Sequence, residues 1–137
     1  MDINILKGDI TTVEAEAFVL FHFEQDDRLL ETTAAVNDAV GSIIAQVIEA
    51  GDFRGEHLEH LLLYSQGSLK TKRILLMGLG KREEFSAHAL REATAQSLRT
   101  LRDRRQPRAV LPIPFDGEFP LELSDTAEAC VLGGMLG

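Results

Sequence analysis

Two closely spaced histidines are the first candidates for a functional site in this chain, because histidine is a common metal ligand. His57 and His60 lie three residues apart, and each follows a glutamate, a composition that zinc sites use. A zinc site needs three or four ligands that supporting groups hold in place, and these two histidines lie where a loop enters a predicted strand. We therefore predict no metal site, and we expect these two histidines, together with His22 and His88, to be surface residues.

A glycine turn is the second candidate, because glycine-rich turns between a strand and a helix bind phosphate through backbone N–H groups. Gly78 and Gly80 follow the apolar run of residues 74–77, but neither common phosphate motif fits. A dinucleotide fingerprint needs a third glycine or alanine where this chain has Glu83, and a P-loop needs Ser or Thr where it has Arg82. We expect a tight strand-to-helix turn, with Gly78 and Gly80 as candidate ligand contacts at the sheet edge where α/β proteins usually bind ligands.

Nucleophilic or acid–base catalysis has little support in the sequence. Cys130 is the single cysteine, and it lies among small apolar residues with no histidine nearby, so we expect a packed core thiol. No spacing of carboxylates, or of Ser, His and Asp, indicates a catalytic pair or triad. We therefore predict no catalytic residue and no cofactor.

Composition and charge limit the partners and the compartment. The 137 residues include 22 acidic and 14 basic ones, for a formal net charge of −8, which disfavours binding to nucleic acid. No apolar run approaches the roughly 20 residues that cross a bilayer, and the first residues lack the pattern of a secretory signal. One cysteine cannot form an internal disulfide. We expect a cytoplasmic protein with one domain over residues 1–137, and with neither nucleic acid nor membrane as a partner.

Strand and helix patterns alternate along the chain, which predicts a layered α/β domain with a mixed sheet. A long helix is expected over residues 28–50, with Gly51 after its end and with Gly41 inside it at a point of close packing. Another helix, with Ser86 as its cap, is expected over residues 87–101, and its buried stripe should consist of Leu90, Ala93, Leu98 and Leu101. Strands are predicted at residues 3–6, 17–23, 61–64, 74–77 and 109–113, and a last helix from residue 124 or 125.

Residues 7–11, KGDIT, resemble the opening of macro domains, where Gly-Asp-Ile-Thr precedes a strand. The resemblance implies that Asp9, followed by Ile10, contacts a ligand, with the aspartate accepting a hydrogen bond from the adenine amino group of ADP-ribose. The pattern then departs, because residues 20–23, LFHF, replace the Asn-Ala-Ala-Asn segment, and no glycine triplet follows to hold the diphosphate. Asp9 could equally cap its own turn through its side chain, and this is the role we favour.

Residues 72–81, KRILLMGLGK, resemble the Lys-Arg-x-Leu-Leu-x-Gly-Leu-Gly-Lys signature of the amino-terminal domain of the leucyl (cytosol) aminopeptidase family. Residues 51–56, GDFRGE, resemble the family's Gly-Asp-Phe-Lys-Gly loop, and residues 90–93, LREA, resemble its Leu-Arg-(Glu/Lys)-Ala-Ala helix. The tail from residue 127 resembles the helix that leads into the catalytic domain, although Leu132 stands where the family has glutamate. The resemblance covers essentially the whole chain and implies a three-layer, macro-domain-like α/β fold.

The family's metals and catalytic residues come from a carboxyl-terminal domain with an Asn-Thr-Asp-Ala-Glu-Gly-Arg-Leu motif, which has no match here. The resemblance therefore implies a non-catalytic accessory domain that acts in protein interaction or oligomer assembly. Its expected partner is a second copy or an aminopeptidase catalytic domain, with Leu132 and Met135 as interface residues on an apolar stripe of the terminal helix. The alternative is a macro-like module that binds an adenine nucleotide or an ADP-ribose-like ligand.

Overall fold

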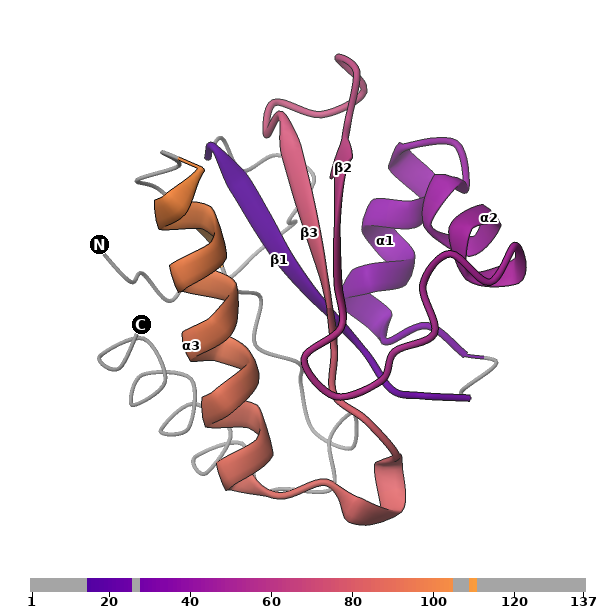
Figure 1. The fold of residues 1–137 in the computed structure, drawn as a ribbon. Helices are drawn as coiled ribbons and strands as arrows, with labels where there is room; N and C mark the ends of the chain where they lie inside the picture. The colour runs from indigo at the N-terminus through magenta and orange to yellow at the C-terminus, as the bar shows by residue number, and fades with distance from the viewer. Residues whose placement is uncertain (1–14, 26–27, 105–108, 111–137) are drawn as a thin grey trace.

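The computed structural model describes residues 15–25, 28–104 and 109–110 (Figure 1). Asp9, Ile10, Cys130, Leu132 and Met135 lie outside these described residues, as do the strand predicted at 3–6 and the helix predicted from 124. The elements follow the chain in the order β1 (Ala17–His22), α1 (Glu31–Ala39), α2 (Ile43–Glu49), β2 (His60–Tyr64), β3 (Arg73–Gly78), the short 3-10 helix η2 (Arg82–Glu84), α3 (Ala87–Asp103) and β4 (Ala109–Val110).

A mixed sheet forms the middle layer, and within the described residues its strands lie in the order β2-β3-β1-β4. Strand β1 pairs in parallel with β3 and with β4, whereas β2 runs antiparallel to β3. Helix α3 covers one face of the sheet, and α1 and α2 cover the other (Figure 1). The three-layer α/β fold with a mixed sheet is therefore confirmed.

The alternating side chains of β1 and β3 divide the core in two. Val19 and Leu75 face the α3 side, where Leu90 is fully buried with them. Their sequence neighbours point to the opposite face, where Phe18 and Leu76 pack with Ile44 of α2. Because both faces are covered, all six residues of β1 are buried, which explains why this strand reads as a continuous apolar run.

Helix α3 forms as the sequence predicts. The Ser86 side chain accepts a hydrogen bond of 3.1 Å from the Ala89 N–H at the start of the helix. The predicted buried stripe is confirmed, since its members are at most 2% exposed: Leu90, Ala93, Leu98 and Leu101. This long helix fixes the segment that follows β3 against the sheet.

The single helix predicted over residues 28–50 is wrong, because the chain breaks into α1 and α2. Gly41 and Ser42 adopt left-handed backbone conformations, with φ values of +72° and +65°, and the Asn37 side chain accepts from the Ala45 N–H across the break. No atom lies within 4 Å of the position that a Cβ would take at Gly41, so the close packing expected there is also wrong. Gly41 is instead needed because the turn between α1 and α2 requires a left-handed backbone, which glycine adopts without steric cost. Gly51 follows α2 with a φ of +83°, as predicted.

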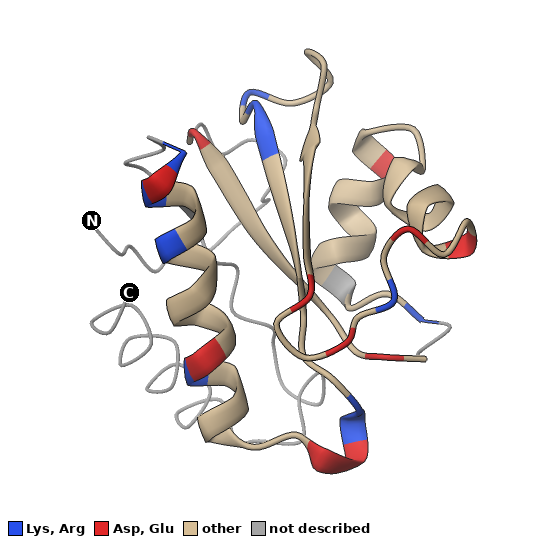
Figure 2. Cartoon of the chain, viewed as in Figure 1, with Lys and Arg blue, Asp and Glu red and all other residues tan. Residues whose placement is uncertain are grey.

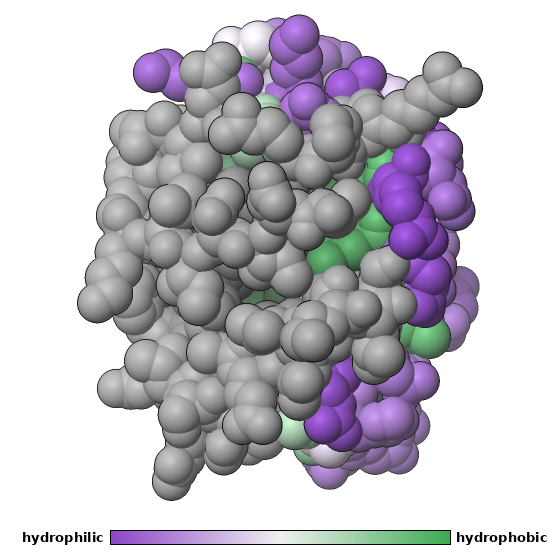
Figure 3. Space-filling view, turned by 90° about the vertical axis from the view of Figure 1, so that its left-hand side faces the viewer, coloured by the Kyte–Doolittle hydropathy of each residue, from purple (hydrophilic) through white to green (hydrophobic). Residues whose placement is uncertain are grey.

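The described surface on the α3 side is mostly hydrophilic, with hydrophobic residues visible in a limited area beside residues that are not described (Figure 3). Within the described ranges, Tyr64 is the one large apolar side chain that is exposed, at 53%, and the Arg73 guanidinium lies 5.5 Å from its ring centre. None of the helices in the described ranges has the length and apolar character that crossing a bilayer requires.

Candidate functional site

The turn that follows β3 is covered by the loop between α2 and β2. The Gly80 N–H donates to the Gly55 carbonyl at 2.9 Å, and the Gly78 N–H donates to the Glu59 carbonyl at 2.7 Å. A Cβ at Gly78 would lie 2.0 Å from the carbonyl oxygen of Glu56, a distance that no side chain tolerates. Gly78 is thus required because two backbone segments touch at this point.

The end of β1 closes the same turn from its other side. The Leu79 N–H donates to the His22 carbonyl at 3.0 Å, and the Glu24 N–H donates to the Gly80 carbonyl at 2.8 Å. All three N–H groups of residues 78–80 therefore donate to protein carbonyls. None of them is left to bind a phosphate, although the turn lies at the sheet edge that favours ligands.

A carboxylate of the chain itself holds the covering loop. Oε1 of Glu59 accepts hydrogen bonds from the consecutive N–H groups of Arg54, Gly55 and Glu56, at 2.9, 2.9 and 3.1 Å. Successive N–H groups that converge in this way form a concave anion site, and here an internal anion fills it. Both parts of this contact, the GDFRGE segment and Glu59, are present in the sequence, but their spacing did not predict that the glutamate would accept hydrogen bonds from the segment.

An open hollow of about 380 Å³ lies beside the covered turn. Its volume falls in the range of small-molecule sites. At its floor the rings of His22 and Phe53 lie 6.3 Å apart, and both residues are at most 2% exposed. The lining residues are His22, Glu24, Gln25, Ile48, Phe53, Arg54 and Glu56.

The expectation that His22 lies at the surface is wrong. His22 is the last residue of β1, it pairs in register with Gly78, and only 2% of it is exposed. Its place at the end of a fully apolar run, directly before Phe23, was the available signal. Histidines in such positions are covered when a distant loop, here the one with Phe53, packs over the strand end.

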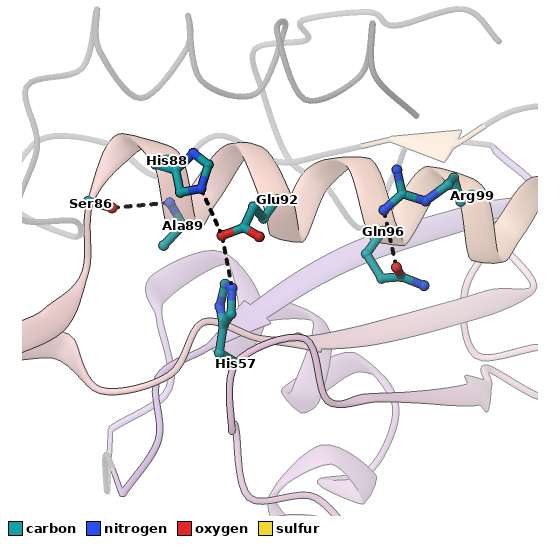
Figure 4. Close-up of polar contacts among 7 residues, drawn as sticks. All are labelled: His57, Ser86, His88, Ala89, Glu92, Gln96 and Arg99. Atoms are coloured by element: carbon teal, nitrogen blue, oxygen red, sulfur yellow. Dashed lines mark hydrogen bonds and ion pairs between the residues drawn. The ribbon is translucent and has the colours of Figure 1, made fainter.

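The other histidines lie outside the hollow. His57 and His88 each place Nε2 near Oε1 of Glu92, at 3.4 and 3.2 Å, and the carboxylate lies between the two rings (Figure 4). His60 does not join them, since its Nδ1 lies 3.2 Å from the Leu58 carbonyl. Across residues 15–25, 28–104 and 109–110, no three His, Cys, Asp or Glu side chains are arranged to hold a metal. The Glu92 contact instead ties the covering loop to α3.

The fold places the chain in a known structural class. It superposes on the macrodomain of DarG from Mycobacterium tuberculosis with a TM-score of 0.71 and 12% identity, over 98% of this chain and 90% of that one. It also superposes on tomato leucine aminopeptidase with a TM-score of 0.64 and 14% identity, over 96% of this chain and 28% of that one. At such identities these similarities show the fold alone. The protein is a macrodomain-like α/β module.

The sequence identifies the family within this class. A model of the N-terminal domain of the cytosol aminopeptidase family matches residues 18–137, and the chain belongs to that family. The probable cytosol aminopeptidase of Alkaliphilus metalliredigens is 28% identical over 138 residues, which cover 100% of this chain and 27% of the relative. The first three curated relatives are matched over 16–27% of their length. The family resemblance inferred from the sequence is thus confirmed.

Of the predicted site residues, Gly78 and Gly80 are the two that lie within the described ranges. Gly78 and Gly80 lie in the covered turn, and their role as ligand contacts stays a prediction. None of the residues that line the hollow was predicted to be a site residue, although three of them lie in the GDFRGE segment, which was identified only as a family motif. Phe53 and Arg54 in that segment are the ones whose position in a family motif could have indicated it.

Proposed function

We propose that this domain is a non-catalytic accessory module of leucyl aminopeptidase type, which acts in the cytoplasm as one folded unit and through protein contacts. Its membership of the N-terminal domain family over residues 18–137 is the observation that supports this most strongly. The chain matches about a quarter of the relative from Alkaliphilus metalliredigens, so the proposal leaves catalysis to the remainder of such a protein.

The proposed contact surface is the predicted terminal helix, with Leu132 and Met135 as its interface residues. In the described ranges, a single large apolar side chain, Tyr64, is exposed, so that part of the surface offers no large apolar patch. The proposed partner is a second copy of this chain or an aminopeptidase catalytic domain. Neither nucleic acid nor a membrane is among the proposed partners, in keeping with the net charge of −8.

The alternative, binding of an adenine nucleotide or ADP-ribose-like ligand, rests on Asp9 in its Gly-Asp-Ile-Thr context and on the macrodomain-like fold. The described turn argues against a diphosphate at Gly78 and Gly80, because its three N–H groups are already bonded within the protein. We therefore favour the accessory role.

Catalysis is tested with the whole 137-residue chain, leucine p-nitroanilide, and manganese or zinc, with the full-length relative from Alkaliphilus metalliredigens as positive control. We expect no release of p-nitroaniline above buffer from the chain alone. Steady metal-dependent hydrolysis that scales with its concentration would overturn the non-catalytic assignment.

Self-association is tested by multi-angle light scattering at high micromolar concentration. We expect a mass above that of the monomer for the wild type, and a monomeric mass for Leu132→Glu, which restores the family's usual residue. A monomeric wild type would remove self-association from the proposal and leave the catalytic domain as the expected partner.

A further inference from the structure

The hollow beside β1 has an aromatic base, formed by Phe53 and the imidazole of His22, and a charged rim. Phe53 and His22 are buried at its base, and Ile48 of α2 lies half-buried at its side. The rim has two carboxylates, Glu24 and Glu56, one guanidinium, Arg54, and the amide of Gln25. Acidic and basic residues both occur in the loops at this end of the molecule (Figure 2).

The charged side chains of the rim are available to a ligand. Within the described ranges, none of Glu24, Arg54 and Glu56 forms an ion pair with another residue. An open hollow with both signs of charge at its rim can therefore pair each charge with an opposite charge on a bound molecule.

The backbone that presents these side chains is held in place before any ligand binds. Glu24 is fixed by its N–H bond to Gly80, and residues 54–56 are fixed by the Glu59 carboxylate. The two rim segments also touch, since a Cβ at Gly55 would lie 2.9 Å from the Phe23 carbonyl oxygen. Such pre-organisation lowers the entropy lost on binding.

We propose that this hollow binds a free α-amino acid with an aliphatic side chain. The carboxylates of Glu24 and Glu56 bind the ammonium group of the amino acid, and the guanidinium of Arg54 binds its carboxylate. Ile48 and Phe53 contact its aliphatic carbons. The net negative rim selects against a phosphate or diphosphate, because two carboxylates repel an anion that one guanidinium attracts. The proposal is independent of the accessory role, since it uses neither Leu132 nor Met135, the interface residues proposed for that role.

The test is an NMR titration of the 15N-labelled 137-residue chain with three ligands of matched shape. L-leucine has both charges, L-leucinamide lacks the carboxylate and represents the amino end of a peptide, and 4-methylpentanoate lacks the ammonium. We expect saturable shifts at residues 22–25 and 53–56, with a dissociation constant of about 1 mM for L-leucine, since the charged rim is open to water. Each of the other two ligands should bind about tenfold more weakly.

Two variants and a matched control assign the roles of the rim residues. Glu56→Gln should weaken L-leucine binding several-fold, whereas Glu83→Gln, on the exposed η2 turn, should leave it unchanged. Arg54→Met should remove the preference for L-leucine over L-leucinamide. The proposal is overturned if no chemical shift saturates, or if the shifts lie outside residues 22–25 and 53–56. It is also overturned if the three ligands bind equally, or if Glu56→Gln binds L-leucine as tightly as the wild type and Glu83→Gln do.

Discussion

Strands β1 and β3 are neighbours in the sheet, and their last residues, His22 and Gly78, are paired in register, yet the two strand ends differ. After β3 the backbone is covered, and each N–H of residues 78–80 is bonded to protein. After β1 the chain borders a hollow of about 380 Å³ with charged residues at its rim.

The same loop produces both surroundings. The backbone of residues 55–59 bonds to the turn after β3, while the side chains of Phe53, Arg54 and Glu56 line the hollow. The macrodomain-like fold provides a sheet edge, but the loop between α2 and β2 determines which part of that edge a ligand can reach. The difference between the two strand ends therefore lies in one short segment, and substitutions there can test it.

The largest effect is expected from Gly78→Ala. The added Cβ would lie 2.0 Å from the Glu56 carbonyl oxygen and 2.6 Å from the Gly55 carbonyl carbon, so the loop has to move off the turn. We expect the free energy of unfolding to fall by about 3 kcal/mol or more, measured by urea denaturation. Gly67→Ala is the control: Gly67, unlike Gly78, has a left-handed φ of +87°, but no atom lies within 4 Å of the added Cβ, so the variant should lose only about 1 kcal/mol. Equal losses in the two variants would show that the loop does not press on the turn.

A smaller effect is expected from Glu59→Gln, which keeps an oxygen acceptor but removes the charge that three N–H groups share. Hydrogen bonds to charged groups are stronger than neutral ones, so we expect a loss of about 1–2 kcal/mol. Hydrogen exchange at the amides of residues 54–56 should accelerate more than exchange in β3. Unchanged protection of those amides would contradict the role given to Glu59.

The smallest effect is expected at the outer contact between the covering loop and α3. His57 and Glu92 side chains are 36% and 44% exposed, and exposed pairs contribute little because water and salt screen them. A double-mutant cycle with His57→Gln and Glu92→Gln should give a coupling of at most about 0.5 kcal/mol. A coupling well above this value would mean that α3, rather than Glu59, holds the loop in place.

Local patterns predicted those elements whose causes lie close together in the sequence. The apolar run of β3, the Ser86 cap and the α3 stripe depend on residues a few positions apart, and Gly51 marks the end of α2 in the same way. The family motifs then predicted the macrodomain-like fold. The signature in residues 72–81 includes Gly78 and Gly80, the two glycines that lie against the covering loop.

Features that depend on distant contacts were not predicted. The apolar spacing of residues 28–50 continues in helical register through Gly41, so periodicity did not reveal a break that two left-handed residues produce. His22 is buried by Phe53, which lies 31 positions later in the chain, and no local pattern reports such a contact. The Glu59 carboxylate likewise finds its three donors only once the loop has folded.

The loop between α2 and β2 covers the sheet edge after β3, and we propose that this domain serves as an accessory rather than as a nucleotide-binding unit. Calorimetric titration of the 137-residue chain with ADP-ribose, repeated with Asp9→Ala, distinguishes these two roles. We predict millimolar or undetectable binding that the substitution does not change. Micromolar binding that Asp9→Ala abolishes would contradict the accessory role and establish the nucleotide-binding alternative.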